Sequence, residues 1–358
     1  MENVLTMLNA IPKSNYAINT RLNRTSDTKL VAINETKIVH DTLNHLDKFF
    51  DTQDVIVVND ASVIPGSFQG IHFPSNSLIE FRLVRFLGSS RTDFSTWEAI
   101  VYGEGNWTSP TENRLLPPDI CIGDLLITGD LVAKVINISS FSKRLLTIEF
   151  QEPEEIILHK IFTYGKMIQY SYLQDELKIW DHQTIFSTYP ISIEPNSASF
   201  QLNWDLMFKL QKKGVQIIPL THAISISNTG IEELDKQLPF SERYWLSQRS
   251  ADMLNDAIDK NKNIIAFGTS VTRSLESIML KSKEFISGSD KVDLIISKSH
   301  RLQVTNGILT GMHMINESHI NLLQAFLPLE LLLKEYSYAM TQNFKWHEYG
   351  DNMLIKNF

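Results

Sequence analysis

The sequence predicts an α/β domain with a largely parallel sheet, interrupted by a small all-β domain. A β-branched run at 54–58 predicts a buried strand early in the chain. Between 67 and 150, strand patterns recur about every ten residues with no amphipathic helix among them, which is typical of a small barrel or sandwich. From about 153 onward, helix and strand patterns alternate, which indicates an α/β domain.

The first segment predicts one helix followed by one strand. Asp41 is the expected N-cap of a helix whose apolar positions include Leu43, Leu46 and Phe49. The strand at 54–58 then ends at a polar turn, Asn59-Asp60. We assign this segment to the same domain as the C-terminal part of the chain.

The middle segment carries alternating apolar and polar residues. Expected strands lie at 79–83, 97–102, 124–127, 131–138 and 145–150. The α/β main domain is therefore expected to comprise 1–66 and 151–358, and the inserted β domain 67–150.

The C-terminal segment alternates between the two periodicities. We expect helices at 153–165, 204–213 and 247–260, another from about 269, and two within 319–344 divided near Pro328. Strands are expected at 215–220, 263–267 and 292–297, with a last strand after Tyr349-Gly350-Asp351.

Composition narrows the class of protein. Of 358 residues 43% are hydrophobic and 21% charged, and Cys121 is the only cysteine, which excludes an intrachain disulfide and a cysteine-rich metal site. A net charge of −8 argues against broad, nonspecific nucleic-acid binding, although one local basic face remains compatible with it. The N-terminus lacks a signal-peptide pattern, and the apolar stretch at 322–333 is too interrupted to span a bilayer. We expect a soluble, cytoplasmic protein.

The strongest candidate site is Gly268-Thr269-Ser270, where a buried strand turns into a helix. Exposed backbone N–H groups and the helix dipole at such a turn favour an anionic or polar ligand. Thr269 or Ser270 acting only as a helix cap explains the same pattern. Arg273 and Glu276 share one face of this helix, and a surface ion pair is the simpler explanation for them.

Two histidines are further candidates. His222 follows the strand at 215–220, and His313 follows Thr310-Gly-Met. Histidine titrates near neutrality and can serve as an acid, a base or a hydrogen-bonding anchor, although a lone histidine is more often structural. Neither histidine has the spacing or the carboxylate neighbours of a metal site, so no metal is expected. A turn before the last strand accounts for Tyr349 and Asp351 without any function.

Six short collinear segments, distributed along nearly the whole chain, resemble the S-adenosylmethionine:tRNA ribosyltransferase-isomerase family of queuosine biosynthesis. They are Val57-Val-Asn-Asp60 with Val63-Ile-Pro65, Gln183-Thr184, Ser241-Glu242 with Tyr244 and Leu246, Gly268-Thr-Ser-Val-Thr-Arg-Ser-Leu-Glu-Ser277, Asn306-Gly307 with Leu309-Thr310 and His313, and Tyr349-Gly-Asp351 with Met353-Leu-Ile355.

The resemblance implies a barrel-like α/β main domain with an inserted small β-barrel, and a reaction. Family members transfer the ribosyl part of S-adenosylmethionine to an aminomethyl-deazaguanine base in tRNA, rearrange it to an epoxycyclopentane and release adenine and methionine. S-adenosylmethionine is then a substrate, and neither a prosthetic group nor a metal is needed. The reaction needs a base beside the sulfonium, a group that helps adenine to leave and a site closed to water.

The resemblance also suggests roles for individual residues. Three residues are assigned to catalysis: His222, His313 and Glu242. Seven are assigned to S-adenosylmethionine: Asn59, Asp60, Gly268, Thr269, Ser270, Arg273 and Glu276. Five are assigned to the acceptor: Gln183, Thr184, Arg301, Tyr349 and Asp351. For Arg301, the expected contact is a phosphate or a carboxylate. The partners expected are S-adenosylmethionine and tRNA, with no membrane, for a monomer or homodimer.

The chain departs from the family pattern at several motif positions. Two arginines of the family's Asn-Asp-Thr-Arg-Val-Ile-Pro-Ala-Arg are serines here, Ser62 and Ser67, and serine provides neither a charge nor a fork of donors. The family's Ala-Pro-Thr-Ala-Gly-Leu-His-Phe is Glu194-Pro-Asn-Ser-Ala-Ser-Phe200, without histidine.

Two further departures change the expected pocket. The family's Leu-His-Val-Gly-Leu-Gly-Thr-Phe corresponds to Thr221-His-Ala-Ile-Ser-Ile-Ser227, so that its two glycines are replaced by Ile224 and Ile226. The isoleucine side chains are expected to fill space that a ligand would approach. The family's histidine before Ser-Glu is Phe240. The alternatives are therefore a divergent paralogue that uses S-adenosylmethionine or a related nucleoside with another acceptor, and a non-catalytic nucleoside-binding protein.

Overall fold

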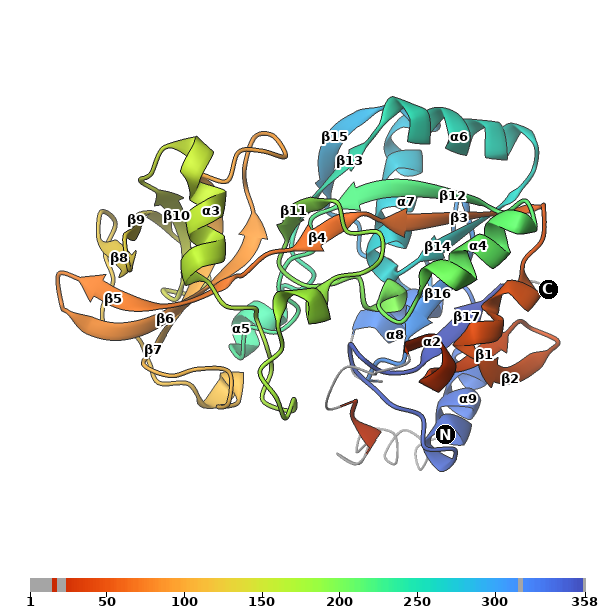
Figure 1. Cartoon of the computed structure of the whole chain (residues 1–358), viewed down its shortest axis with the longest axis horizontal. Helices are drawn as coiled ribbons and strands as arrows, with labels where there is room; N and C mark the ends of the chain where they lie inside the picture. The colour runs from red at the N-terminus through yellow and green to blue at the C-terminus, as the bar shows by residue number, and fades with distance from the viewer. Residues whose placement is uncertain (1–14, 18–23, 315–317, 357–358) are drawn as a thin grey trace.

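The structure, a computed structural model, describes residues 15–17, 24–314 and 318–356. A large mixed sheet flanked by helices forms one part of the molecule, and a closed six-stranded barrel forms the other (Figure 1). The predicted fold class, an α/β main domain with an inserted small β-barrel, is confirmed. The exact division at 67 and 150 stays a prediction, and its first segment includes residues 1–14 and 18–23, which lie outside the described residues.

The main sheet has nine strands. In spatial order they are β15 (Gly288–Val292), β13 (Glu242–Leu246), β12 (Gln216–His222), β3 (Asp54–Asn59), β14 (Asn263–Phe267), β16 (Thr305–Gly311), β17 (Asn352–Ile355), β1 (Lys29–Ile33) and β2 (Ile38–Thr42). The four central strands β12, β3, β14 and β16 run parallel, while β13 and β17 run antiparallel to β12 and β16. The carboxyl ends of the central strands therefore lie at one edge, beside the first residues of β13 and β17.

Helices cover both faces of this sheet, so its central strands are apolar on both sides. Along β3, Ile56 and Val58 pack against α4 (Trp204–Lys212) and the 3-10 helix η2 (Leu43–Phe49). The alternate residues Val55 and Val57 pack against α6 (Gln248–Asp259) and α7 (Thr269–Ser282). This alternation is why the run at 54–58 is continuously apolar. A further cluster forms around α8 (Ser318–Leu323) and α9 (Leu329–Thr341).

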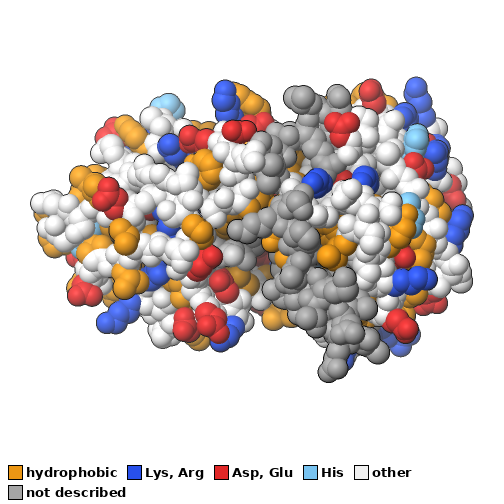
Figure 2. All heavy atoms as spheres, turned by 90° about the horizontal axis from the view of Figure 1, so that it is seen from below, with side chains coloured by type: hydrophobic (Ala, Val, Ile, Leu, Met, Phe, Trp, Pro, Cys, Tyr) orange, Lys and Arg blue, Asp and Glu red, His pale blue; other side chains and the backbone are white. Residues whose placement is uncertain are grey.

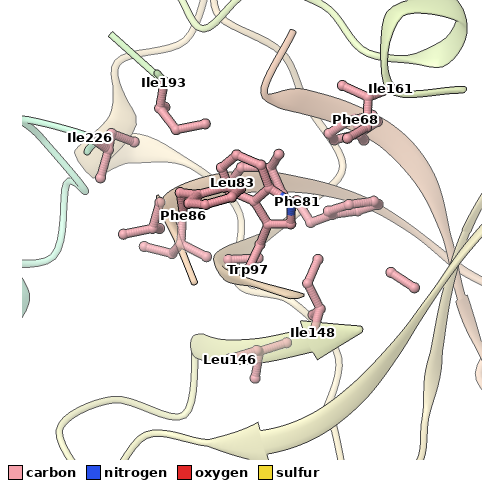
Figure 3. Packing of buried hydrophobic residues seen from close by; sticks show 14 of the residues in the cluster. Phe68, Phe81, Leu83, Phe86, Trp97, Leu146, Ile148, Ile161, Ile193 and Ile226 are labelled. Carbon is pink, nitrogen blue, oxygen red and sulfur yellow. The ribbon is translucent and has the colours of Figure 1, made fainter. Parts of the chain in front are cut away.

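The barrel closes in the order β10 (Leu145–Phe150), β7 (Thr96–Gly103), β6 (Ser77–Phe86), β5 (Ser67–Phe73), β8 (Leu125–Thr128) and β9 (Leu131–Ile138). Trp97 lies at the centre of its core, with Phe86 edge-on at a centroid distance of 5.0 Å and Phe81 and Leu83 nearby (Figure 3). Ile193 and Ile226 of the main part join the same apolar cluster, so the two parts share a core at their junction.

Short elements join the barrel to the main sheet. The strands β4 (Ala61–Val63) and β11 (Tyr189–Ser192) pair in parallel between the barrel and the main sheet, and α3 (Glu154–Tyr164) packs on the barrel (Figure 1). The one-turn helix α5 (Glu232–Asp235) follows the loop after β12. Three further 3-10 turns are η3 (Thr111–Asn113), η4 (Ile179–His182) and η5 (Ser197–Ser199), and α2 (Arg24–Asp27) precedes β1.

Two local predictions were wrong, and the strand β5 was not predicted. Asp41 is not a helix N-cap but a residue of β2, paired with Leu30 of β1, and the helix after it is a 3-10 helix. The strand predicted at 292–297 lies earlier in the chain, at 288–292, because its pairing with β13 ends at Val292. The sequence reasoning also missed β5, in which Gly70 packs against the Ile127 carbonyl of β8.

Within the described parts of the chain, no helix combines the length and the apolar character needed to cross a lipid bilayer.

Candidate functional site

Most of the predicted site residues gather at the carboxyl edge of the central strands. His222 ends β12, Asn59 ends β3, Gly268 follows β14, and His313 comes shortly after β16. Glu242 begins β13 at the same edge, because β13 runs antiparallel to β12. In open α/β sheets this edge is where ligands bind.

The centre of this edge is a buried polar cluster around His222, which is fully buried. Its Nδ1 lies 2.6 Å from the Ser274 hydroxyl on α7, and its Nε2 lies 2.9 Å from Oε2 of Glu242. A guanidinium N–H of Arg273 donates to the same Oε2, while the amide and hydroxyl of Ser225 donate to the other oxygen at 2.7 Å. Every polar atom of the His222 ring and of the Glu242 carboxylate is therefore engaged.

This arrangement keeps Glu242 ionised. Burial acts to raise the pKa of the Glu242 carboxyl, but the charges of Arg273 and His222 and their hydrogen bonds outweigh it and hold the pKa well below its ordinary value. Arg273 is fixed in turn, because its Nε donates to the Leu294 carbonyl at 3.0 Å. Glu242 is thus a buried anion with fixed donors on both oxygens.

Asn59 and Asp60 tie neighbouring strands to this cluster. The Asn59 amide donates to the His222 carbonyl at 2.9 Å and accepts from the His222 amide at 2.9 Å. Asp60 accepts a 2.6 Å hydrogen bond from the Thr221 hydroxyl. Burial raises the pKa of Asp60 despite that bond and the charge of Arg91. Asp60 is half-buried, so its carboxylate is the more accessible of the two side chains.

The turn from β14 into α7 adopts the predicted strand–glycine–helix form. Gly268 has a φ of +108°, which favours glycine, and a side chain there would come within 2.3 Å of the Asn196 Oδ1. The Asn196 amide donates to the Phe267 carbonyl at 2.7 Å. The side chain of Asn196 therefore lies against the turn that begins with Thr269 and Ser270, of which Ser270 is buried.

A second buried group, which the sequence reasoning missed, lies beside this centre. The Tyr170 hydroxyl donates to Glu194 Oε1, which also accepts from the Ser227 amide at 3.0 Å. Burial raises the pKa of Glu194 and, together with Glu194, that of Tyr170. The one available signal was Glu194 itself, an acidic residue where the family motif has alanine.

Glu348 belongs to the same neighbourhood, since its charge acts on Tyr170. Its Oε2 is buried without a hydrogen-bond partner among the described residues, and burial raises its pKa to about 7. A carboxyl group that titrates near neutrality can exchange a proton at physiological pH. Its place immediately before Tyr349-Gly350-Asp351 was the only sequence clue.

The remaining acceptor candidates hold the backbone in place. Gln183 exchanges two hydrogen bonds with Val63, of 2.8 and 3.0 Å, and the Thr184 hydroxyl accepts from the Phe186 amide. Asp351 accepts from the amides of Lys29 and Lys345 at 2.7 Å. These contacts position the segments around the carboxyl edge.

Two further candidates, Tyr349 and His313, each contact a histidine. The Tyr349 hydroxyl lies 3.3 Å from Nδ1 of the buried His182. The ring of His313 stacks on that of His319 at 3.7 Å.

Glu276 and Arg301 do not join this group. Glu276 lies further along α7, where its carboxylate accepts from the amides of Gln303, Val304 and Thr305 before β16 begins, at the opposite edge of the sheet. Arg301 is exposed on the same loop. The predicted surface ion pair between Arg273 and Glu276 was wrong. Both residues are buried, and Arg273 pairs with Glu242 whereas Glu276 pairs with His300.

The positions that depart from the family pattern have definite environments. Ser67 donates to Glu80 at 2.7 Å, Ser62 is half-buried on β4, and Phe240 is buried. Ile226 is buried in the apolar cluster of the barrel, whereas Ile224 is half-buried (Figure 3). In the described parts of the chain, no group of three or more His, Cys, Asp or Glu side chains is arranged to hold a metal ion.

The fold and this cluster define an α/β protein with an inserted β-barrel and a polar centre at the carboxyl edge of its sheet. The chain belongs to the queuosine biosynthesis protein family, whose pattern matches residues 9–355.

Named relatives and a solved structure resemble the chain over most of its length. It is 27% identical to the S-adenosylmethionine:tRNA ribosyltransferase-isomerase of Cytophaga hutchinsonii, over 97% of each chain. It is 26% identical to that of Clostridium kluyveri, over 89% of each chain. The crystal structure of the S-adenosylmethionine tRNA ribosyltransferase from Thermotoga maritima superposes with a TM-score of 0.52 at 19% identity, covering 96% of this chain and 97% of that one, and supports the fold.

Proposed function

We propose that the chain is an S-adenosylmethionine:tRNA ribosyltransferase-isomerase, a transferase and isomerase of tRNA modification in queuosine biosynthesis. The family membership and the end-to-end match to relatives of that name support this function. The enzyme transfers the ribosyl part of S-adenosylmethionine to a deazaguanine base in tRNA, isomerises it and releases adenine and methionine. S-adenosylmethionine is consumed as a substrate, and the reaction needs no prosthetic group or metal.

The single observation that carries the proposal is the buried cluster of His222, Glu242 and Arg273 at the carboxyl edge of the sheet. Three separate elements, β12, β13 and α7, supply it, and it lies at the same edge as the turn at Gly268. Its fixed dipoles and charges form a preorganised polar environment, which is what a reaction of a sulfonium and a glycosidic bond requires.

The contacts suggest a division of roles. His222 is a positioning residue, because both its ring nitrogens are held by Ser274 and Glu242. Glu242 is an anionic anchor. A base that removes a proton beside the sulfonium needs a pKa near the working pH, and Glu348, with a pKa of about 7, is one candidate for that step. His313, whose ring stacks on that of His319, is the other. Asn59, Asp60 and the Gly268–Ser270 turn are proposed to hold the nucleoside, and Gln183, Thr184, Tyr349 and Asp351 to shape the acceptor site.

The setting of the enzyme is part of the proposal. The substrates are S-adenosylmethionine and tRNA, the location is the cytoplasm, and the protein is a monomer or homodimer. Figure 2 shows acidic and basic side chains interspersed over one face of the molecule, so a local contact with tRNA fits better than a broad basic field. We also propose that 67–150 and the flanking segments 1–66 and 151–358 are separate domains.

The test is incubation of the purified protein with S-adenosylmethionine and tRNA carrying the aminomethyl-deazaguanine base. Adenine release that depends on this tRNA supports the proposal. Adenine release only with another acceptor indicates the divergent paralogue, and calorimetric binding of S-adenosylmethionine without turnover indicates a binding protein. The serines at 62 and 67 and the isoleucines at 224 and 226 are the features that these two alternatives would explain.

A further inference from the structure

Three arginine side chains gather around one tyrosine on the barrel. The guanidinium carbons of Arg82, Arg114 and Arg144 lie 5.5, 5.6 and 4.6 Å from the ring centroid of Tyr102. Arg82 is 1% exposed and Arg114 7% exposed, and Arg144 is half-buried. The Tyr102 hydroxyl donates to the Thr229 carbonyl at 2.7 Å, so the cluster faces the loop that follows β12. This arginine cluster is therefore held at the junction of the barrel and the main sheet.

The charges of the arginine cluster are not balanced. Glu80 accepts from Nε of Arg82 at 2.7 Å and from Nη2 of Arg114. Nε of Arg144 donates to the Val101 carbonyl at 3.1 Å. Among the described residues, Glu80 is thus the single carboxylate that forms salt bridges with the three guanidinium groups, and it pairs with Arg82 and Arg114. Burying cations without enough counter-charge is costly, so a second anion is expected at this place.

Four nitrogens of the cluster have no acceptor in the part of the chain that the structure describes. Nη1 of Arg82, Nε and Nη1 of Arg114, and Nη2 of Arg144 are buried, and no hydrogen-bond partner for them exists among the described residues. Buried polar groups in folded proteins are nearly always satisfied, and the exceptions often mark ligand sites. Planar guanidinium groups present paired donors that match the oxygens of a carboxylate or a phosphate.

We propose that Arg82, Arg114 and Arg144 bind one oxyanion group of a ligand. The arginines supply the N–H donors, and the Tyr102 ring stabilises all three guanidinium groups through cation–π contact. Ser67 completes the arrangement, because its hydroxyl shares Glu80 Oε1 with Arg82. The family pattern has an arginine at position 67, where this chain has a serine. The cationic groups of the arginine cluster come instead from β6, which carries Arg82, and from the loops that carry Arg114 and Arg144.

The site is continuous with the carboxyl edge of the main sheet. Tyr170 lies near Arg82 and donates to Glu194, which in turn lies near Glu242. This step rests on the proposed function: the oxyanion then belongs to a substrate of that enzyme. Two sources carry the chemistry, the carboxylate of the methionine part of S-adenosylmethionine and a phosphate of the tRNA.

The first experiment uses inorganic phosphate as the probe. The thermal midpoint of the full chain is measured against phosphate concentration at constant ionic strength, balanced with chloride. We expect a saturable rise for the wild type. Arg144→Gln leaves the pairs of Glu80 intact, and for this variant we expect an unchanged or higher midpoint without phosphate and a half-maximal phosphate concentration raised about tenfold or more.

The matched control is Arg243→Gln, since Arg243 is also half-buried and also donates to a carbonyl, that of Ser89. This variant should respond to phosphate like the wild type. Absence of a saturable rise in the wild type, or the same phosphate response in Arg144→Gln, would overturn the oxyanion site. The site stands if phosphate binds in this way while adenine release fails, which separates it from the proposed function.

Competition distinguishes the two sources. Displacement of phosphate by S-adenosylmethionine but not by its decarboxylated form supports the carboxylate. Displacement by an anticodon stem-loop RNA supports the tRNA phosphate. If neither ligand displaces phosphate, the assignment of the oxyanion to the substrates of this enzyme is wrong.

Discussion

The imidazole of His222 and the carboxylate of Glu242 form a buried pair, with Nε2 and Oε2 2.9 Å apart. The two residues come from β12 and β13, whose antiparallel pairing brings the end of one strand beside the start of the other. Arg273 of α7 joins the same carboxylate oxygen. The pair and Arg273 therefore connect β12, β13 and α7 at the edge of the sheet where a ligand is expected.

Replacing either candidate histidine by alanine should impair turnover. His222→Ala removes the ring that spans Ser274 and Glu242, and His313→Ala removes a candidate acid–base group. We expect each to lower the rate of tRNA-dependent adenine release by at least about tenfold, since acid–base and positioning groups contribute on the order of 10²–10⁴. The exposed His159→Ala is the control. Rates within about twofold of wild type would exclude these roles.

Glu242→Gln should destabilise the fold most at neutral pH. The folded pKa of Glu242 lies below its ordinary value of 4.5, so its carboxylate stabilises the protein above that pH, and the stabilisation is lost as the pH falls below it. At pH 7 the variant leaves Arg273 buried without its partner, at a cost of about 3–5 kcal/mol. Urea unfolding at several pH values should show this difference shrinking toward acid.

The partly exposed pair Glu98–Arg85 provides a comparison for Glu242. Glu98→Gln should cost about 1 kcal/mol or less. An equal loss in both variants, or a Glu242→Gln loss that does not depend on pH, would contradict the ionised state of Glu242.

His182→Gln should flatten the stability profile at mildly acidic pH. Burial lowers the pKa of His182 from 6.5 to about 4, so the fold holds the neutral ring and stability falls as the pH drops from 6.5 toward 4. The wild type should lose up to about 3 kcal/mol across this window through His182. The slopes of unfolding free energy against pH measure it, and identical slopes for both proteins would refute the effect.

Glu348→Gln should have the opposite pH dependence. Burial raises the pKa of Glu348 from 4.5 to about 7, so the fold favours its protonated form, and stability is lost as the pH rises from 4.5 through 7. The variant should therefore gain stability relative to wild type between pH 5 and pH 8. Chemical unfolding at these two values tests it, and a constant difference would show that the carboxyl is not held neutral.

Gly268→Ala should destabilise the turn into α7 through two separable effects. The left-handed φ of +108° and the 2.3 Å approach to Asn196 both oppose a side chain. Gly123→Ala is the control for the backbone, since its φ is +98° and nothing lies within 4 Å of the new atom. We expect Gly268→Ala to cost about 1–3 kcal/mol more than Gly123→Ala, and Asn196→Ala to relieve part of this excess. Equal costs would show that the contact does not matter.

Periodicity predicted most of the fold because apolar patterns report burial directly. The run at 54–58 was found as β3, and Asn263–Phe267 was found with its bounds, since both strands are covered on two faces. Asp41 was misassigned because strand pairing with β1 overrode a local capping signal. The strand β5 was missed because Gly70 and polar residues interrupt its alternation.

The site was harder to predict than the fold, because its contacts join residues far apart in sequence. The resemblance to the family singled out His222 and Glu242, but spacing does not show that Arg273 completes their cluster. Glu194, Tyr170 and Glu348 were missed, since a buried carboxyl is recognised by its surroundings and not by its neighbours in the chain. Glu276 was selected through its motif and lies at the other edge of the sheet.

The most direct test of the central claim is the stoichiometry of the reaction. Purified protein is incubated with S-adenosylmethionine and tRNA bearing the aminomethyl-deazaguanine base, and adenine and the digested nucleosides are quantified by mass spectrometry. The account predicts one adenine for each epoxycyclopentane-modified nucleoside, with both products strongly reduced in His222→Ala. S-adenosylmethionine left intact beside unmodified tRNA, with a folded and active control enzyme in the same assay, would contradict it.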